Sequence, residues 1–337
     1  MGDISAPIIY ELDYSSEGLQ DSDSGVQETV GKDAKYLLHY PTVYIVNDKN
    51  KEKQFSVYIG ETSDIKKRTV QHLTVDPKTR TDWENLAISD SSKMYVIGHE
   101  HFNKSLTLDI ENKLMLYMSS IENVDAVYNR RTNQQNDYFT SHELDKIFSK
   151  VWRGLQKKNK ELFPVEQIIR DSAIFKASPF HKLTEEQIRT KDFITLRIMQ
   201  ALTKEETGQL ILVTGEAGSG KTVLMSSLFY ELNQLSKEDP ENLIFKDTKN
   251  FLLVNHEQQL KVYQQIATKL GIYSKKQPDL VSKPTPFINN HGPEDKVDVL
   301  IVDEAHLLWT QGKQSYRGKN QLHDLLERAK VVVAVFD

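Results

Sequence analysis

Apolar residues in the first half of the chain fall into short runs of the length of β-strands. Two of these runs, YPTVYIV and FSVYIG, are separated by the polar stretch NDKNKEKQ. Runs rich in Val, Ile and Tyr on either side of a polar segment are typical of a β-hairpin, here with a long loop. KMYVIG, at residues 93–98, is expected to add a third strand. Helices are expected over residues 64–73 and 103–118, because apolar residues recur there at helical spacing.

Longer apolar runs alternate with helical stretches in the second half of the chain. The runs are LILVTG, NFLLVN, VDVLIVDE and KVVVAVFD. Strands that are apolar throughout, rather than at every second position, are typical of a parallel sheet covered on both faces. The sequence therefore predicts an α/β protein, with a small α+β domain followed by a parallel-sheet domain.

Changes of composition divide the chain into four expected segments. Residues 1–34 are rich in Asp, Glu, Ser and Gly and are expected to be acidic and flexible. Residues 35–138 are expected to form the first folded domain, and residues 139–182 a helical linker. Residues 183–337 are expected to form the second folded domain.

Composition narrows the classes of function. The 337 residues include no cysteine, which excludes disulfides, thiol nucleophiles and thiolate metal sites. No apolar run approaches the roughly 18 residues of a membrane helix, and the first residues lack a signal peptide, so a cytoplasmic protein is expected. Because the net charge is −5, nucleic-acid binding requires a local basic patch. The candidate residues are Lys66, Lys67 and Arg68, with Lys157, Lys158 and Lys160 as a weaker set.

The stretch GEAGSGKT matches the pattern G-x-x-x-x-G-K-[ST] between a strand and a helix. Glycines in such a P-loop let backbone N–H groups surround phosphate oxygens. Lys221 would bind the β- and γ-phosphates of ATP, and the Thr222 hydroxyl would bind Mg²⁺. The predicted nucleotide-binding residues of the loop are Gly215, Glu216, Ala217, Gly218, Ser219, Gly220, Lys221 and Thr222.

The apolar run VDVLIVDEAH supplies two acids about eighty residues beyond the P-loop. Asp303, at the end of the predicted strand, can hold Mg²⁺, and Glu304 can orient or deprotonate the attacking water. His306 follows them, either as a residue that couples ATP to nucleic-acid binding or as a capping or core histidine.

The literal text DEAH resembles the Walker B box of helicases, and the rest of the second half extends this resemblance. The strand–helix run LLVNHEQQLKVYQQIATKLG lies where helicases carry a strand-contacting motif, and VVVAVFD resembles their γ-phosphate-sensing strand. Gln187, in LTEEQ, is similar to an adenine-reading glutamine. Residues 183–337 thus resemble the first RecA-like lobe of a Schlafen-type or superfamily 1-like helicase. The resemblance implies that a partner subunit or a further C-terminal lobe completes the ATPase.

Residues that suit phosphodiester chemistry recur in the first half. Thr42–Val–Tyr44 and Tyr58–Ile–Gly60 lie on the two hairpin strands. Arg68 and His72 are spaced i and i+4, so they share one face of the following helix. Glu111 stands on a later helix that is otherwise patterned for burial.

This order resembles the GIY-YIG nuclease family over residues 36–135, although the first motif reads Thr-Val-Tyr here. The resemblance implies that Glu111 holds one divalent ion, Mg²⁺ or Mn²⁺, and that Arg68 neutralises charge on the scissile phosphate. Tyr44 or Tyr58, beside His72, would activate water, and the sequence leaves that choice open. A terminal asparagine would complete the site, with Asn129 as the first candidate and Asn133 as the second.

The combined reading is an ATP-dependent nucleic-acid-processing protein. A DNA endonuclease domain would be joined to a helicase-type ATPase, in the manner of bacterial anti-phage defence or DNA repair, and RNA remains open as the substrate. Two alternatives stand beside this reading. One is an ATP-driven DNA-binding module with an inactive nuclease fold, and the other is an NTPase signalling switch.

Overall fold

The computed structural model describes residues 4–15, 18, 22–89, 91–129, 138–238, 243–274, 276–312 and 315–336. The chain divides into two compact units, Met1–Phe175 and Lys176–Asp337, each with its own five-stranded sheet. The α/β fold expected from the sequence is confirmed, with a mixed sheet in the first unit and a parallel sheet in the second.

The sheet of the first unit has the strand order β1-β4-β2-β3-β5. All neighbouring strands are antiparallel except β3 and β5, which are parallel. The strands are β1 (Ile8–Asp13), β2 (Thr42–Lys49), β3 (Phe55–Thr62), β4 (Lys93–Gly98) and β5 (Val124–Val127). The predicted hairpin is β2–β3, and its register places Tyr44 opposite Gly60.

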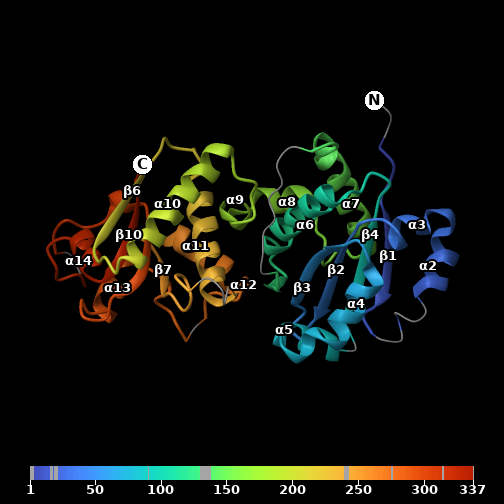
Figure 1. Ribbon diagram of the computed structural model, residues 1–337, viewed down its shortest axis with the longest axis horizontal. Coiled ribbons are helices and arrows are strands. Elements are labelled where there is room, and N and C mark those ends of the chain that lie inside the picture. Colours follow the sequence, from blue (N-terminus) through green and yellow to red (C-terminus); the bar gives the residue numbers. More distant parts are fainter. Residues whose placement is uncertain are drawn as a thin grey trace. The chain divides into compact units, whose positions relative to one another are not determined.

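Helices cover both faces of this sheet (Figure 1). On one face lie α2 (Ser22–Val30), α3 (Lys35–Leu38), α4 (Ile65–Thr74) and α5 (Thr81–Ile88). On the other lie α6 (Lys104–Ser119) and α7 (Leu144–Lys158). Short helices complete the unit: η1 (Gly31–Ala34), η2 (Asp76–Lys78), η3 (Ser141–Glu143) and α8 (Glu166–Asp171). The helix α9 (Ala173–Ala177) includes the last residues of the first unit and the first residues of the second.

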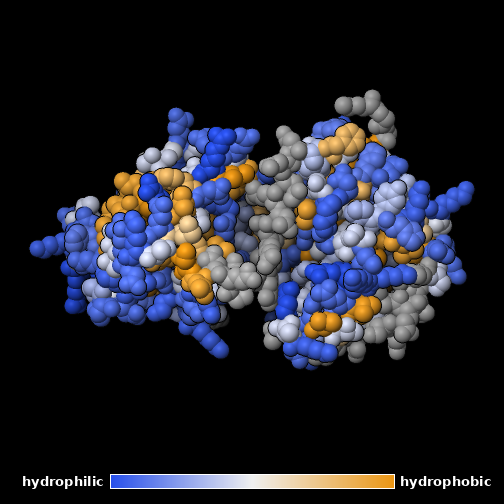
Figure 2. Space-filling model, viewed as in Figure 1, coloured by the Kyte–Doolittle hydropathy of each residue, from blue (hydrophilic) through white to orange (hydrophobic). Residues whose placement is uncertain are grey.

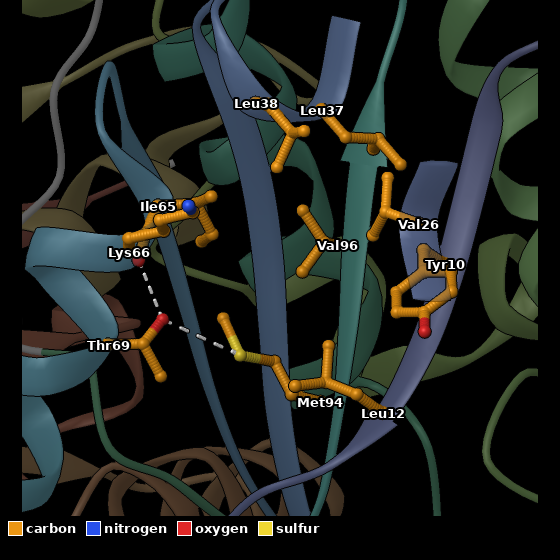
Figure 3. A pocket seen from close by; sticks show the side chains of 10 residues that line it. All are labelled: Tyr10, Leu12, Val26, Leu37, Leu38, Ile65, Lys66, Thr69, Met94 and Val96. Carbon is orange, nitrogen blue, oxygen red and sulfur yellow. Dashed lines mark hydrogen bonds between the residues drawn. The ribbon is translucent and has the colours of Figure 1, made fainter. Parts of the chain in front are cut away.

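Two segments differ from their expected roles. Residues 1–34 were expected to be flexible, but Ile8–Asp13 pair with β4 as an edge strand, and Tyr10, Leu12 and Val26 line a small apolar cavity of about 30 Å³ beside α4 (Figure 3). The apolar side chains of this segment pack against residues that are distant in the sequence. Its acidic composition could not predict those contacts. The helix α7 was expected in a linker, yet Phe148 and Trp152 pack edge-on against Tyr117 of α6 in the first unit.

The sheet of the second unit is parallel throughout, in the order β6-β10-β9-β7-β8. Its strands are β6 (Gln209–Thr214), β7 (Asn250–Val254), β8 (Val281–Ser282), β9 (Val297–Asp303) and β10 (Ala329–Phe336). The helices are α10 (Glu185–Thr203), α11 (Lys221–Glu238), α12 (Glu257–Lys269), α13 (Pro284–Asn290), η4 (Ala305–Leu307) and α14 (Gln321–Glu327). This arrangement is consistent with a RecA-like lobe.

The helices α13 and α14 pack on one face of this sheet, and α10 and α11 on the other (Figure 1). The sequence predicts a sheet covered by helices on both faces, but the described residues leave the edge strand β6 partly exposed. Leu210 and Leu212 remain 39% and 59% exposed, and Phe193 and Leu196 of α10 are also exposed. Figure 2 shows this gathering of hydrophobic side chains over β6 and α10.

Candidate functional site

The P-loop connects β6 to α11 in the second unit, as the sequence predicts. Gly218 and Gly220 both have φ of +82°, a conformation that side-chain-bearing residues rarely adopt. The local glycine pattern therefore fixes a tight turn whose end becomes the N-terminus of α11, where anions bind favourably.

Lys221 and Thr222 open α11 and line a cavity of about 250 Å³. The Lys221 ammonium donates hydrogen bonds to the carbonyl oxygens of Gly215 and Glu216, at 2.8 and 2.9 Å. Asp303 and Glu304, from the end of β9, line the same cavity. The two predicted motifs, some eighty residues apart in the sequence, are therefore brought together, and Lys176 joins them.

Asp303 is 2% exposed, and hydrogen-bond donors approach both oxygens of its carboxylate. The backbone N–H of Glu304 donates to Oδ1 at 3.0 Å. The amide of Gln259 and the hydroxyl of Tyr263 both donate to Oδ2, each at 2.7 Å. The sequence analysis did not identify Gln259 and Tyr263 as site residues. Their spacing of one helical turn on α12 was the only signal in the sequence, and it is common on any helix.

Glu304 and His306 follow Asp303 in a sharp turn. Glu304 has φ of +53°, and His306 Nε2 lies 3.4 Å from its carboxylate. Because the His306 side chain is 38% exposed, it is not a core histidine, and the coupling and capping readings both stay open. Asp337, the polar tip of the predicted sensing strand, lies outside the described residues.

Gln187 lies beside the P-loop. Its side chain forms a capping box with Thr184 at the start of α10, and its Nε2 donates to the carbonyl oxygen of Ser219 at 2.9 Å. A Cβ on Gly220 would come within 2.4 Å of that same Nε2. The side chain of Gln187, the predicted adenine-reading glutamine, is thus in contact with the backbone of the P-loop.

Tyr44 and His72 form the centre of a second cluster, in the first unit. The Tyr44 hydroxyl lies 2.7 Å from His72 Nε2, and Arg68 Nε lies 3.4 Å from the same hydroxyl. His72 Nδ1 lies 2.5 Å from Oδ2 of Asp76. If Asp76 is ionised, Nδ1 carries the proton and Nε2 is the acceptor for the Tyr44 O–H. Four groups therefore form a continuous hydrogen-bonded chain.

Burial governs the ionisation of this cluster. It raises the pKa of the Tyr44 hydroxyl well above its usual value and also raises that of Tyr58. Burial, together with the positive charge of Arg68, lowers the pKa of His72 to about 4, although the Asp76 carboxylate acts in the opposite direction. The resting cluster thus holds protonated tyrosines and a neutral histidine near pH 7.

Glu111, on α6, is a further ionisable group close to this cluster, and its charge acts on Tyr44 and Tyr58. Burial and then the neighbouring Glu61 carboxylate raise the pKa of Glu111 to about 8, while Lys104 and Arg68 act to lower it. Glu61 forms an ion pair with Lys104 through Oε1, and its buried Oε2 has no hydrogen-bond partner among the described residues. Two neighbouring, partly buried carboxyl groups, one of them with an unsatisfied oxygen, fit a divalent cation such as Mg²⁺, which prefers oxygen ligands.

Asn129 occupies a structural position. Its side chain accepts from the N–H of Ile59 at 3.0 Å and donates to the carbonyl oxygen of Ile59 at 2.5 Å, so it holds β3 next to Tyr58. Asn133, the other candidate, lies outside the described residues. Trp83 was missed by sequence reasoning: it stacks on His72 with ring centroids 3.7 Å apart.

The basic patches differ in their surroundings. Lys66 and Lys67 lie on α4, the helix that carries Arg68 and His72 into the cluster. Lys157 and Lys158 form the last turn of α7, and Lys160 follows that helix. The first set therefore adjoins a predicted site on its own helix.

Comparison with known proteins bears on the second unit. Residues 208–337 match the family model described as Schlafen group 3, DNA/RNA helicase domain. The second unit carries a Schlafen group 3 helicase domain. This match covers the P-loop, the DEAH sequence and all five strands of the parallel sheet.

An uncharacterized protein of Saccharomyces cerevisiae is 36% identical to this chain over 154 residues. The aligned segment is 44% of this chain and 33% of the yeast protein, so the chain spans about a third of that relative. No solved structure matches the chain. Among the described residues, no helix combines the length and the hydropathy needed to cross a bilayer.

Proposed function

We propose that this protein joins a helicase-type ATPase to a metal-dependent endonuclease that acts on DNA. The helicase domain implies an ATPase and nucleic-acid binding. For the nuclease, the observation that carries the proposal is the hydrogen-bonded chain Arg68–Tyr44–His72–Asp76. Because both units lie in one chain, we propose that DNA cleavage depends on ATP binding or hydrolysis. ATP-dependent cleavage would suit defence against foreign DNA or DNA repair. RNA remains an alternative substrate.

In the ATPase, each residue of the cavity has a distinct task. Lys221 would bind the β- and γ-phosphates, and the loop N–H groups would surround their oxygens. Thr222 and Asp303 would hold Mg²⁺, which neutralises phosphate charge. Their fit is supported by the Gln259 amide, which lies 3.5 Å from Thr222 Oγ1 and 2.7 Å from Asp303 Oδ2, so both oxygens face one place. Glu304 would orient the attacking water.

The ATPase is tested by hydrolysis assays on wild type and Lys221→Ala, with and without single-stranded and double-stranded DNA and RNA. We expect hydrolysis that nucleic acid stimulates and that Lys221→Ala abolishes. Hydrolysis that persists in Lys221→Ala would exclude this site as its source. A purified wild type that binds ATP without hydrolysing it would support an ATPase that a partner subunit or a further lobe completes.

In the nuclease, Arg68 would neutralise the scissile phosphate, and a divalent cation held by Glu111 would stabilise charge on its oxygens. We assign water activation to Tyr44 rather than Tyr58, because the Tyr44 hydroxyl already has an acceptor for its proton in His72 Nε2. A water proton passes to the Tyr44 oxygen as the Tyr44 proton passes to His72, and Asp76 stabilises the imidazolium that forms.

Substrate binding would prepare this proton transfer. Tyr44 has no exposed surface in the structure, and Arg68 is one of the groups around its hydroxyl. A phosphate that draws Arg68 toward itself would uncover the hydroxyl. It would also neutralise the Arg68 charge that contributes to the low pKa of His72, so His72 would become a stronger base only when substrate is present.

The same burial of Tyr44 favours a second candidate function, a DNA-binding module whose nuclease fold no longer cuts. The two candidates are separated by comparing Tyr44→Phe and Tyr58→Phe in a DNA-cleavage assay and a DNA-binding assay. The nuclease proposal predicts that Tyr44→Phe abolishes cleavage and leaves binding intact. Absence of cleavage by a folded wild type that binds DNA would favour the binding module.

A further inference from the structure

Gln259 and Tyr263 lie one turn apart on α12 and both donate to the same oxygen, Oδ2 of Asp303. Both also approach the other predicted Mg²⁺ ligand. Gln259 Nε2 lies 3.5 Å from Thr222 Oγ1, and the Tyr263 hydroxyl lies 3.3 Å from the Thr222 carbonyl oxygen. One face of α12 thus bridges the P-loop and the DEAH sequence.

This bridge is well placed to act as a rigid support. Tyr263 is 2% exposed, and its hydroxyl donates to Asp303 Oδ2 from within the core. A third link lies at the start of the same segment, where Asn255 Nδ2 donates to the carbonyl oxygen of Leu307 at 2.7 Å. The segment 255–263 therefore contacts the chain on both sides of Glu304.

We propose that Gln259 and Tyr263 are positioning residues that hold the Asp303 carboxylate and the Thr222 hydroxyl in the arrangement that Mg²⁺–nucleotide binding requires. The inference rests on the proposed ATPase. Groups that hydrogen-bond to metal ligands fix the orientation of those ligands, and their loss commonly lowers metal affinity. By this account α12 controls the metal-dependent part of nucleotide affinity, and the P-loop backbone controls the rest.

Two substitutions remove the donors with little change of shape: Gln259→Leu and Tyr263→Phe. Gln258→Leu is the matched control, because Gln258 is the neighbouring residue on α12 and is exposed. The full chain is used. The dissociation constant of a fluorescent ATP analogue is measured in Mg²⁺ and again in EDTA, and the thermal melting temperature checks that each variant is folded.

The wild type and Gln258→Leu are expected to bind the analogue more tightly in Mg²⁺ than in EDTA. Gln259→Leu and Tyr263→Phe are expected to weaken binding in Mg²⁺ by roughly tenfold, with binding in EDTA unchanged. Equal weakening in Mg²⁺ and EDTA, or no weakening at all, would overturn the positioning role. A wild type that gains nothing from Mg²⁺ would overturn the proposed nucleotide site and this inference with it.

An Asp303→Asn background tests whether the two residues act through Asp303. Adding Gln259→Leu or Tyr263→Phe to Asp303→Asn is expected to cause a smaller further loss in Mg²⁺ than in the wild-type background, because the carboxylate they position is already absent and only their contact with Thr222 remains. A second loss as large as that of the single variant would show that they act independently of Asp303. Because two separate substitutions are compared, misfolding of one leaves the other as the test.

Discussion

Tyr44 lies over Gly60, and the two residues are directly opposite in the β2–β3 register. A Cβ built on Gly60 would come within 2.4 Å of both Cζ and the hydroxyl oxygen of Tyr44. The glycine of the Tyr-Ile-Gly motif therefore leaves the space that the tyrosine of the Thr-Val-Tyr motif occupies. The two motifs form one unit, which places the Tyr44 hydroxyl within reach of His72.

Gly60→Ala tests this interlock. The added methyl group must displace the Tyr44 ring from His72, and displacement of a reacting group by about 1 Å costs about 100-fold in rate. Overpacking should also lower the free energy of unfolding by about 1–3 kcal/mol. DNA cleavage and urea denaturation measure the two effects, with Ser56→Ala on the same strand as control. A Gly60→Ala variant that cuts at the wild-type rate would contradict the assignment.

Asp76→Asn tests the proton path from Tyr44 through His72. The amide keeps the shape of the side chain but removes the charge that holds the proton on Nδ1, so cleavage should fall by about 100-fold, the usual contribution of a general base. Nitrogen-15 NMR of the histidine ring should show a mixture of tautomers in the variant and Nδ1–H alone in the wild type.

Asp125→Asn, on the exposed edge of β5, is the control for this substitution. The NMR readout does not depend on nuclease activity. A wild-type His72 protonated on Nε2 would be incompatible with the proposed proton path, whatever the cleavage rate.

The lowered pKa of His72 predicts a pH dependence of stability. The unfolded chain takes up a proton on this histidine near pH 6.5, and the folded chain only near pH 4. Between these values the unfolded state binds more protons, so stability rises with pH across this window, by up to about 3 kcal/mol. Urea unfolding from pH 4 to 7 should show this rise in the wild type and a flatter curve in His72→Gln.

The exposed His142, changed to Gln, provides the matched control for that experiment. Its curve should follow the wild type. If His72→Gln gave the same slope as the wild type, His72 would not be the buried neutral histidine of the structure.

Glu111→Gln tests the metal site without reference to cleavage. A cation that binds only the folded state stabilises it, by about 2.7 kcal/mol at 100 times its dissociation constant. In nucleotide-free buffer, Mn²⁺ or Mg²⁺ should therefore raise the melting temperature of the wild type above its value in EDTA. Glu111→Gln should lose this response, and the exposed Glu122→Gln should keep it. An unchanged response in Glu111→Gln would place the metal elsewhere.

The sequence predicted those features that depend on local pattern. The P-loop, the DEAH strand end and the β2–β3 hairpin each depend on spacing within a few residues, and the structure has them where expected. Arg68 and His72 share a helix face for the same reason. Asp76 could have been noticed, since it stands four residues beyond His72, but nothing local distinguishes it from a solvated carboxylate.

The remaining features depend on contacts between distant residues. The edge strand Ile8–Asp13 forms because β4, eighty to ninety residues further along the chain, offers it a free edge. The sequence around Ile8–Asp13 is acidic and polar and gives no sign of this pairing. Gln259 and Tyr263 matter through Asp303, forty residues further along the chain. Contacts of this kind depend on how the strands and helices assemble in space. Neither the spacing of apolar residues nor the residue types along the chain can predict them.

The most direct test of the account is plasmid cleavage in Mg²⁺ or Mn²⁺, with and without ATP, by wild type, Glu111→Ala and Lys221→Ala. The account predicts that the wild type cuts, that Glu111→Ala does not, and that Lys221→Ala loses the part of the cutting that ATP licenses. Cutting that survives Glu111→Ala, or no cutting by a folded wild type that binds both ATP and DNA, would contradict it.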